Sequence, residues 1–542
     1  MSQNIKQVVI VGGGSAGWMT AAYLSKALEK DVSITLVESS NVATIGVGEA
    51  TFSTIRLFFD FLGLDERDWM PHCNATYKMG IKFVGWNAEG GHFYHPFQRY
   101  EIVDGFNIGE WWYKLKRDDE PFDYSCFTIP RLCDLQRSPR YLDGTVFDEK
   151  VRRQFEPGYA LRKNMLSDHK IQYPYAYHFD AALLAKFMCG YAMRRGVARI
   201  LDDVVDVTLA EDGSISHIVT KEHGPVEGDL FIDCTGFRGL LINKTLGEPF
   251  IPFAESLLCD SAVAIQMPRD FAARGLNPYT TATALSSGWV WNIPLYGRDG
   301  TGYVYSSAFR TPEEAEREFR EHLGPASEGC KPNHIKMRIG RSRNSWVKNC
   351  VAIGLASGFV EPLESTGIFF IQHGIEELVS HFPNRHHDEQ LIAGYNRAVA
   401  ECIDGVRDFL TLHYIAGTRA DTPFWKATKE EIVVPDRLKE RMELWQARLP
   451  NHRNINLDYH GFEFYSYSVM LLGLGYRPGQ SLPVLDHIDS TNALKTFREI
   501  KERADYLAQT LPSQYEYLTH VRSEAANGRV PDEVGSKETV MV

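Results

Sequence analysis

A glycine-rich turn between two apolar runs constrains the fold of this chain more than any other feature. Residues 8–11 (VVIV) are apolar, residues 12–17 (GGGSAG) form the turn, residues 18–28 have helical spacing, and residues 33–38 (SITLVE) are a second apolar run. This pattern predicts strand, helix, strand. Such a unit implies a parallel sheet, because a crossover helix joins parallel strands.

The spacing of the glycines predicts a dinucleotide site. Gly12 permits a tight turn, Gly14 lets a pyrophosphate approach the backbone, and Gly17 allows the helix to pack closely on the strand. The helix N-terminus adds the positive end of its dipole. Glu38 ends the second run, where an acid binds ribose hydroxyls. The alternative is a glycine-rich turn without a ligand.

Later segments favour FAD over NAD. Residues 229–239 (DLFIDCTGFRG) and 349–359 (NCVAIGLASGF) look like buried strands that end in glycine turns, whereas residues 255–310 contain alternating runs typical of antiparallel strands. The loop GVGEAT (46–51) is placed to run along an isoalloxazine ring. We therefore expect an α/β fold with a Rossmann-like core and an inserted antiparallel sheet.

The sequence pattern of the chain changes near residue 415. Residues 365–382 and 388–413 have helical spacing, and further loop-then-helix patterns follow without another strand–helix–strand signal. We expect a cofactor-binding domain over residues 1–425, a mostly helical module over 426–530 and a frayed tail over 531–542.

Composition excludes several classes of protein. The net charge of -12 argues against nucleic acid or an anionic membrane as the main partner. No apolar stretch is long enough to span a bilayer, and the N-terminus lacks a signal-peptide pattern. Nine scattered cysteines without a CxxC pair indicate reduced thiols and a cytoplasmic location. We expect no metal site, and we interpret the pair His386 and His387 as a solvated loop.

Three longer motifs resemble the flavin-dependent tryptophan halogenases. They are GWVWNIP (288–294), FVEPLESTGIFF (359–370) and CNATYKMGIKF (73–83), and the likeness extends through FYHPF (93–97), QYPYAYHFDA (172–181) and YHGFEFYS (459–466). Within the family, the chain is similar to the branch that halogenates position 5 or 6 of the indole. Alone, Trp289 and Trp291 would be core residues, Lys78 a solvated lysine and Glu364 a first-turn acid. Their joint occurrence inside these motifs favours the family.

The resemblance implies a reaction in two separate places. FADH2 from a separate reductase reacts with O2 to give a flavin hydroperoxide, chloride or bromide attacks it, and the resulting hypohalous acid travels to free L-tryptophan. Lys78 would hold the oxidant by hydrogen bonding or as a haloamine. Glu364 would stabilise the positive ring and accept its proton. We favour position 5, with position 6 as the alternative.

The resemblance also assigns the remaining site residues. Those expected to bind FAD are Gly12, Gly14, Ser15, Ala16, Gly17, Glu38, Gly48, Glu49, Ala50, Gly354, Leu355, Gly367 and Ile368. Halide would lie at Thr366 and Gly367, where a helix begins. Those expected to contact tryptophan are Ser53, His95, Pro96, Phe97, Glu364, Tyr459 and Glu463, with the helical module completing the pocket. Trp289 and Trp291 would keep substrate away from the flavin.

Three other functions remain open from the residues alone. A flavin hydroxylase would consume NAD(P)H directly, a flavin-binding scaffold would lack catalysis, and a halogenase could act on a phenol, a pyrrole or a peptide-bound indole. A homodimer is compatible with the resemblance.

Overall fold

The glycine-rich turn lies inside a six-stranded, mostly parallel sheet of the computed structural model, which describes residues 4–28, 31–41, 48–116, 120–147, 174–451, 455 and 461–528. In spatial order its strands are β10 (Ala198–Leu201), β2 (Ser33–Glu38), β1 (Gln7–Val11), β14 (Leu230–Asp233), β23 (Cys350–Ala352) and β22 (Trp346–Val347). The first five are parallel, and β22 is antiparallel to β23. The predicted strand–helix–strand unit is confirmed, since α1 (Ser15–Ala27) joins β1 to β2.

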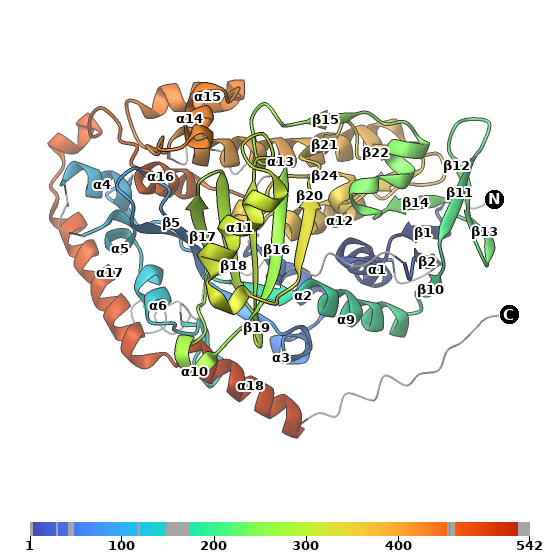
Figure 1. Ribbon diagram of the computed structural model, residues 1–542, viewed down its shortest axis with the longest axis horizontal. Coiled ribbons are helices and arrows are strands. Elements are labelled where there is room, and N and C mark those ends of the chain that lie inside the picture. Colours follow the sequence, from blue (N-terminus) through green and yellow to red (C-terminus); the bar gives the residue numbers. More distant parts are fainter. Residues whose placement is uncertain are drawn as a thin grey trace.

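A second, seven-stranded sheet is almost entirely antiparallel (Figure 1). Its strands in order are β20 (Pro332–Lys336), β16 (Ser261–Pro268), β19 (Arg298–Tyr305), β18 (Gly288–Pro294), β17 (Thr280–Leu285), β5 (Gly80–Val84) and β6 (His92–Pro96). Only the pairing of β17 with β5 is parallel. The antiparallel insertion expected between residues 255 and 310 is therefore present.

Four smaller sheets account for the other paired strands of the described residues. The sheet that matters most for the site contains β3 (Gly48–Ala50), β9 (Ala176–Asp180) and β4 (Thr76–Lys78). The others pair β11 (Val204–Leu209), β12 (Ile215–Thr220) and β13 (Gly224–Glu227), then β15 (Phe250–Pro252), β21 (Gly340–Ser342) and β24 (Gly358–Phe359), and finally β7 (Ile102–Val103) with β8 (Phe106–Asn107).

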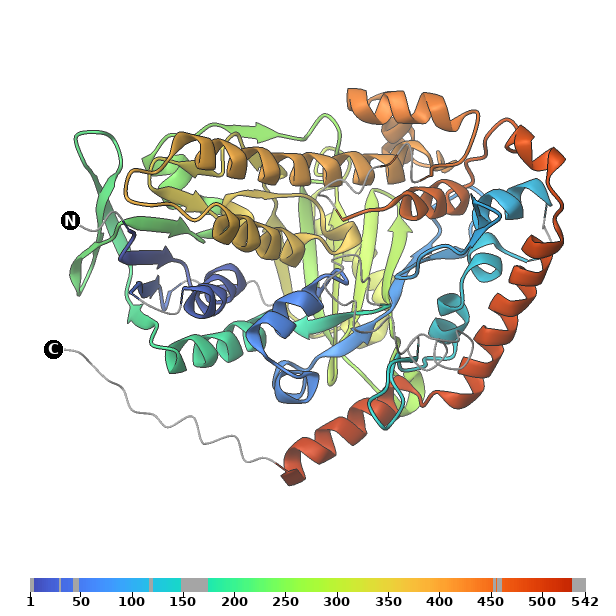
Figure 2. The same ribbon diagram turned by 180° about the vertical axis from the view of Figure 1, so that it is seen from behind.

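Three helices cover the six-stranded sheet next to the glycine turn. Helix α1 packs between α9 (Ala181–Arg194) and α12 (Gly367–Ser380). Helix α12 also packs against α13 (Glu389–Ile415), whose 27 residues run along one side of the molecule (Figure 2). The last turn of α13 reaches the site described below.

The remaining helices surround the seven-stranded sheet. Those before residue 330 are α2 (Ile55–Leu62), α3 (Glu66–Trp69), α4 (Ile108–Lys114), α5 (Phe122–Cys126), α6 (Ile129–Asp134), α10 (Phe271–Arg274) and α11 (Pro312–Leu323). Those that follow α13 are α14 (Pro423–Glu430), α15 (Asp436–Trp445), α16 (Phe464–Gly473), α17 (Thr491–Thr510) and α18 (Gln514–Gly528). Helices α17 and α18 run along the edge of the molecule, where α17 packs against α5 and α6 and α18 packs against α3 (Figures 1 and 2). The domain boundary at residue 425 stays a prediction.

The described helices include none with both the length and the apolar character needed to cross a bilayer. All nine cysteines are free thiols.

Candidate active site

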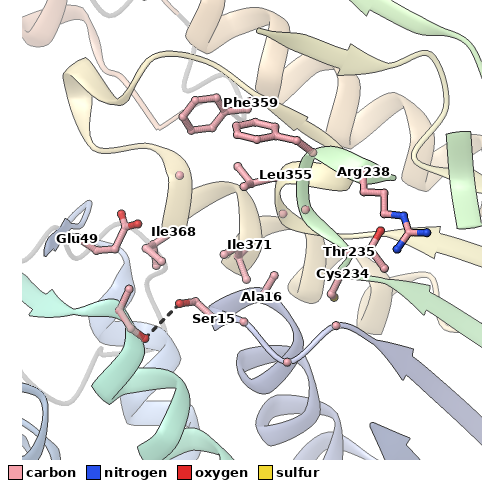
Figure 3. A pocket seen from close by; sticks show the side chains of 18 of the residues that line it. Ser15, Ala16, Glu49, Cys234, Thr235, Arg238, Leu355, Phe359, Ile368 and Ile371 are labelled. Carbon is pink, nitrogen blue, oxygen red and sulfur yellow. Dashed lines mark hydrogen bonds between the residues drawn. The ribbon is translucent and has the colours of Figure 1, made fainter. Parts of the chain in front are cut away.

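A cavity of about 920 Å³ opens where the glycine-rich turn meets the second sheet. Its volume lies toward the upper end of the roughly 300–1,000 Å³ typical of small-molecule sites. Ser15 and Ala16 at the start of α1 form one side, and Leu355 and Phe359 form another (Figure 3). Every residue expected to bind FAD lines this cavity except Gly17; the others are Gly12, Gly14, Ser15, Ala16, Glu38, Gly48, Glu49, Ala50, Gly354, Leu355, Gly367 and Ile368.

Glycine stands at the three positions of the turn for different steric reasons. Gly12 has φ +115°, and a Cβ there would lie 2.3 Å from the carbonyl oxygen of Cys234 on β14. A Cβ on Gly17 would lie 1.8 Å from the Gly12 carbonyl oxygen, which explains why Gly17 is buried beneath the turn rather than exposed to the cavity. A Cβ on Gly14 would meet no atom within 4 Å, so this position leaves the backbone open to a ligand. These residues fit a pyrophosphate at the start of α1.

Glu38 at the end of β2 already has partners. Its carboxylate accepts hydrogen bonds from Trp18 Nε1 at 3.1 Å and from the Arg199 guanidinium at 2.5 Å. Arg199 on β10 also lines the cavity. Sequence reasoning missed Arg199, because no motif joins it to Glu38. The ribose contact expected of Glu38 stays a prediction.

The expected halide site lies at the start of α12. Ser365 adopts a left-handed conformation with φ 63°, and Thr366 then caps the helix without a side-chain hydrogen bond. Thr366 Oγ1 is buried and has no hydrogen-bond partner in the described structure. The first N–H groups of a helix lack intrahelical acceptors, and its dipole favours an anion. An unpaired hydroxyl beside this helix start fits a halide ion.

Lys78 is fully buried at the end of β4. Its ammonium donates hydrogen bonds to the Thr51 carbonyl oxygen at 3.1 Å and to Ser365 Oγ at 2.8 Å, and it lies 4.9 Å from the Phe97 ring centroid. Burial lowers the pKa of Lys78 to about 7, although the charge of Glu364 opposes this. Near neutral pH the side chain is therefore both amine and ammonium. Because Ser365 also lines the cavity, it connects Lys78 to the cavity wall.

Glu364 ends the short turn Pro362–Glu364 and is also fully buried. Its carboxylate faces His95 Nδ1 at 3.0 and 3.1 Å and His413 Nε2 at 2.9 Å. Burial alone would raise the pKa of Glu364, but the charge and hydrogen bonds of the two histidines hold it at about 2. The site thus combines an amine of lowered pKa, Lys78, with an ionised carboxylate, Glu364, and both side chains are buried away from water.

Aromatic rings surround this pair. The ring centroid of Phe52 lies 5.9 Å from that of Phe97 and 5.3 Å from that of Phe462. The Phe462 ring stacks on the Phe409 ring with a centroid distance of 4.0 Å. Both His95 and Phe97 are buried here, as expected of a slot for a flat ring. His95 additionally bonds Glu364, which the sequence did not indicate.

The other residues expected to contact substrate are placed as follows. Pro96 on β6 and Ser53 are buried near the aromatic group, and Glu463 immediately precedes α16. The Glu463 carboxylate accepts hydrogen bonds from the half-exposed Arg99 guanidinium, one of them at 3.0 Å. Tyr459 lies outside the described residues. All of these substrate roles stay predictions.

The two tryptophans expected to shield the flavin have different surroundings. Trp291 lines the cavity, whereas Trp289 lies behind it and donates its Nε1 hydrogen to Glu361 at 2.8 Å. Glu361 also accepts from Tyr414 at 2.5 Å, and burial raises its pKa to about 7. Sequence reasoning missed both Glu361 and Tyr414. Glu361 lies in the same motif as Glu364, which was the available signal for it, whereas Tyr414 lies in none of the motifs.

The sequence predicts no metal site in this protein. In the described part of the chain, no three His, Cys, Asp or Glu residues are grouped in a way that could hold a metal ion.

Comparison with known proteins places this geometry in one family. The sequence model of the family described as tryptophan halogenase matches residues 7–490. The chain is 54% identical to tryptophan 6-halogenase SttH of Streptomyces toxytricini, covering 95% of this chain and 98% of that protein. It is also 54% identical to 7-chloro-L-tryptophan 6-halogenase KtzR of Kutzneria, covering 95% and 99%.

Solved structures agree. The SttH crystal structure matches with a TM-score of 0.88 over 95% of this chain and 100% of that chain. Tar14, a tryptophan C-6 flavin-dependent halogenase (chlorinase) from taromycin biosynthesis, matches with a TM-score of 0.89 at 52% identity over 95% and 100%. The resemblance found in the three motifs is therefore confirmed over almost the whole chain. This protein belongs to the flavin-dependent tryptophan halogenases.

Proposed function

We propose that this protein halogenates free L-tryptophan at carbon 6 of the indole ring, using chloride or bromide. The observation that carries the proposal is the placement of Lys78 and Glu364. Both are fully buried, and Ser365 links Lys78 to the wall of the FAD-sized cavity. An oxidant made in that cavity would therefore meet an amine and a carboxylate that water does not reach.

Family membership implies a flavin and a halide as the cofactor and co-substrate. When bound, reduced flavin supplies with O2 the oxidising power that converts halide to hypohalous acid. The glycine turn, Ser15 and Ala16 would hold the pyrophosphate, and Thr366 with Gly367 would hold the halide. We infer that the reduced flavin comes from a separate reductase. A cytoplasmic location also stays a prediction.

Lys78 acts on the oxidant through its Nζ atom. With a pKa of about 7, Nζ either donates a hydrogen bond to hypohalous acid as ammonium or, as amine, takes the halogen from it, so that the O–halogen bond breaks, an N–halogen bond forms and the hydroxyl leaves as water with a proton from the amine. Phe97, whose centroid is 4.9 Å away, excludes water on one side.

Glu364 acts on the ring after halogen transfer. Its carboxylate is ionised at neutral pH, so it stabilises positive charge on the indole and accepts the proton that leaves the substituted carbon. Glu463, whose carboxylate now accepts from Arg99, would bind the substrate ammonium in place of that partner.

The position of attack differs from the sequence expectation. The motifs favoured position 5, whereas SttH, KtzR and Tar14 are all named for position 6. The comparisons thus support the alternative. KtzR further acts on 7-chloro-L-tryptophan according to its name, so this substrate competes with tryptophan as a candidate.

The test uses the whole protein with FAD, a flavin reductase, NADH and bromide. L-tryptophan and 7-chloro-L-tryptophan are supplied in separate reactions, and products are identified by mass spectrometry and NMR. We expect 6-bromotryptophan with the reductase and no product from Lys78→Ala. Bromination at carbon 5 would reject the position. Hydroxylated product, or NADH consumption without reductase, would reject halogenation.

A further inference from the structure

His413 lies in the last turn of α13 and is fully buried. Its Nδ1 atom lies 2.7 Å from the carbonyl oxygen of Phe409, one turn earlier in the same helix. A carbonyl oxygen only accepts hydrogen bonds, so Nδ1 must carry a proton. In a neutral imidazole that is the only ring N–H, and Nε2 then has a lone pair.

A lone pair on Nε2 is incompatible with the second contact of the ring, because that contact is also with an acceptor. His413 Nε2 lies 2.9 Å from Glu364 Oε1, which is an acceptor when the carboxylate is ionised. Two acceptors at this distance would repel each other in a dry site. One additional proton must therefore lie between them, either on His413 as imidazolium or on Glu364 as carboxylic acid.

His95 shows why the additional proton is specific to His413. Its Nδ1 atom faces both oxygens of Glu364, at 3.0 and 3.1 Å, so a neutral ring with its proton on Nδ1 satisfies them. His413 has no such choice, because the Phe409 carbonyl fixes its tautomer.

We propose that His413 is a positioning residue that carries the additional proton as an imidazolium and thereby holds Glu364 as an anion for proton acceptance. Its ring packs against the Phe409 ring at 4.9 Å and the Phe83 ring of β5 at 5.5 Å between centroids, and these contacts hold its orientation. The proposal rests on the proposed function only for the use made of Glu364.

The titratable groups that face Glu364 come from three elements. They are His95 on β6, His413 on α13 and Lys78 on β4. Lys78 titrates near pH 7 in its own right, so the pH dependence of activity alone would mix two groups. The ionisation of His413 is therefore measured directly.

The first experiment is 15N NMR of histidine-labelled protein without substrate or flavin, at about pH 8. An imidazolium has two protonated nitrogens, whereas a neutral ring has one bare nitrogen with a distinct shift. His178 is an internal reference, since its two nitrogens face Thr76 and Thr280 hydroxyls and burial holds its pKa well below the usual value. We expect two protonated nitrogens for His413 and one for His178.

Signals are assigned by loss in His413→Gln. Should that variant not fold, labelling phenylalanine carbonyl carbons identifies His413 through its hydrogen bond to Phe409. A bare Nε2 at His413 would overturn the proposal, because the proton would then belong to Glu364. This result does not depend on whether the protein halogenates tryptophan.

The second experiment compares kcat of His413→Gln and wild type at saturating tryptophan between about pH 6 and 8. Without the cation Glu364 is protonated more easily, so we expect the ratio of variant to wild-type kcat to fall about tenfold or more toward low pH. His373→Gln removes a buried histidine of α12 that bonds only the Ala398 carbonyl, and serves as control. A ratio independent of pH in His413→Gln would indicate a merely structural role and contradict the proposal.

Discussion

The hydrogen bond between Lys78 and Ser365 should favour the ammonium form of the proposed catalytic amine, and Ser365→Ala tests this. The bond is 2.8 Å long and joins a cation to a neutral hydroxyl in a buried site. Such a bond contributes about 1.5–3 kcal/mol. Since one pH unit of pKa corresponds to about 1.4 kcal/mol, its loss should lower the pKa of Lys78 from about 7 by about 1–2 pH units.

The direction follows from which form of the amine loses a partner. Ammonium has three donors and needs acceptors; after the substitution it keeps the Thr51 carbonyl at 3.1 Å but lacks Ser365. The neutral amine loses less, so deprotonation becomes easier. If a haloamine is required, activity rises with pH through this pKa; if ammonium is required, activity falls. Either limb should move to lower pH in Ser365→Ala.

The assay is kcat for tryptophan halogenation between about pH 5 and 9 with saturating reduced flavin. Ser345→Ala is a matched control, because it removes a buried 2.7 Å hydrogen bond to Ser357 away from Lys78. We expect its profile to equal that of the wild type. A Ser365→Ala limb at the wild-type pH, or at higher pH, would refute the reasoning.

Three further changes test the cavity and its wall. Burial raises the pKa of Glu361 to about 7, so wild type loses stability as pH rises from about 4.5 to 7. The free energy of unfolding of Glu361→Gln should therefore rise by up to about 3 kcal/mol relative to wild type over this range. Thermal unfolding that shows the same difference between the two proteins at pH 5 and at pH 8 would contradict this. Thr366→Val should raise the KM for bromide about tenfold without changing the KM for tryptophan, since it removes an unpaired buried hydroxyl. A Cβ on Gly302 would lie 2.0 Å from the Trp291 ring, so Gly302→Ala should weaken FAD binding about tenfold in a fluorescence titration, and adding Trp291→Phe should restore it.

Local spacing predicted the parts of the fold that depend on local sequence. The strand, turn and helix around Gly12 were expected because each step has its own periodicity, and the structure agrees. Lys78 and Glu364 differ, since neither lies in a pattern that chemistry alone distinguishes from a surface lysine or a first-turn acid. Only the resemblance of whole motifs singled them out, and the structure then placed both in one buried site.

Contacts between distant segments were beyond the sequence. His413 lies 49 residues from its partner Glu364, inside a long helix whose apolar spacing makes a buried histidine unremarkable as core. Arg199 reaches Glu38 from a strand that pairs with β2 only in the folded sheet. The expectation of position 5 has another weakness: it rested on short local likenesses, whereas whole-chain similarity favours position 6.

The end of α13 forms hydrogen bonds to both buried acids of the site, Glu364 and Glu361. His413 and Tyr414 are adjacent on this helix, and they bond Glu364 and Glu361, which are three residues apart around a short 3₁₀ turn. Neighbouring helix residues point about 100° apart, so one helix end reaches both acids only if the turn presents them on one side, as residues i and i+3 of a 3₁₀ turn do. Glu361 in turn holds Trp289 behind the cavity wall. A shift of this helix end would therefore disturb the acid near Lys78 and the hydrogen bond that holds Trp289 together.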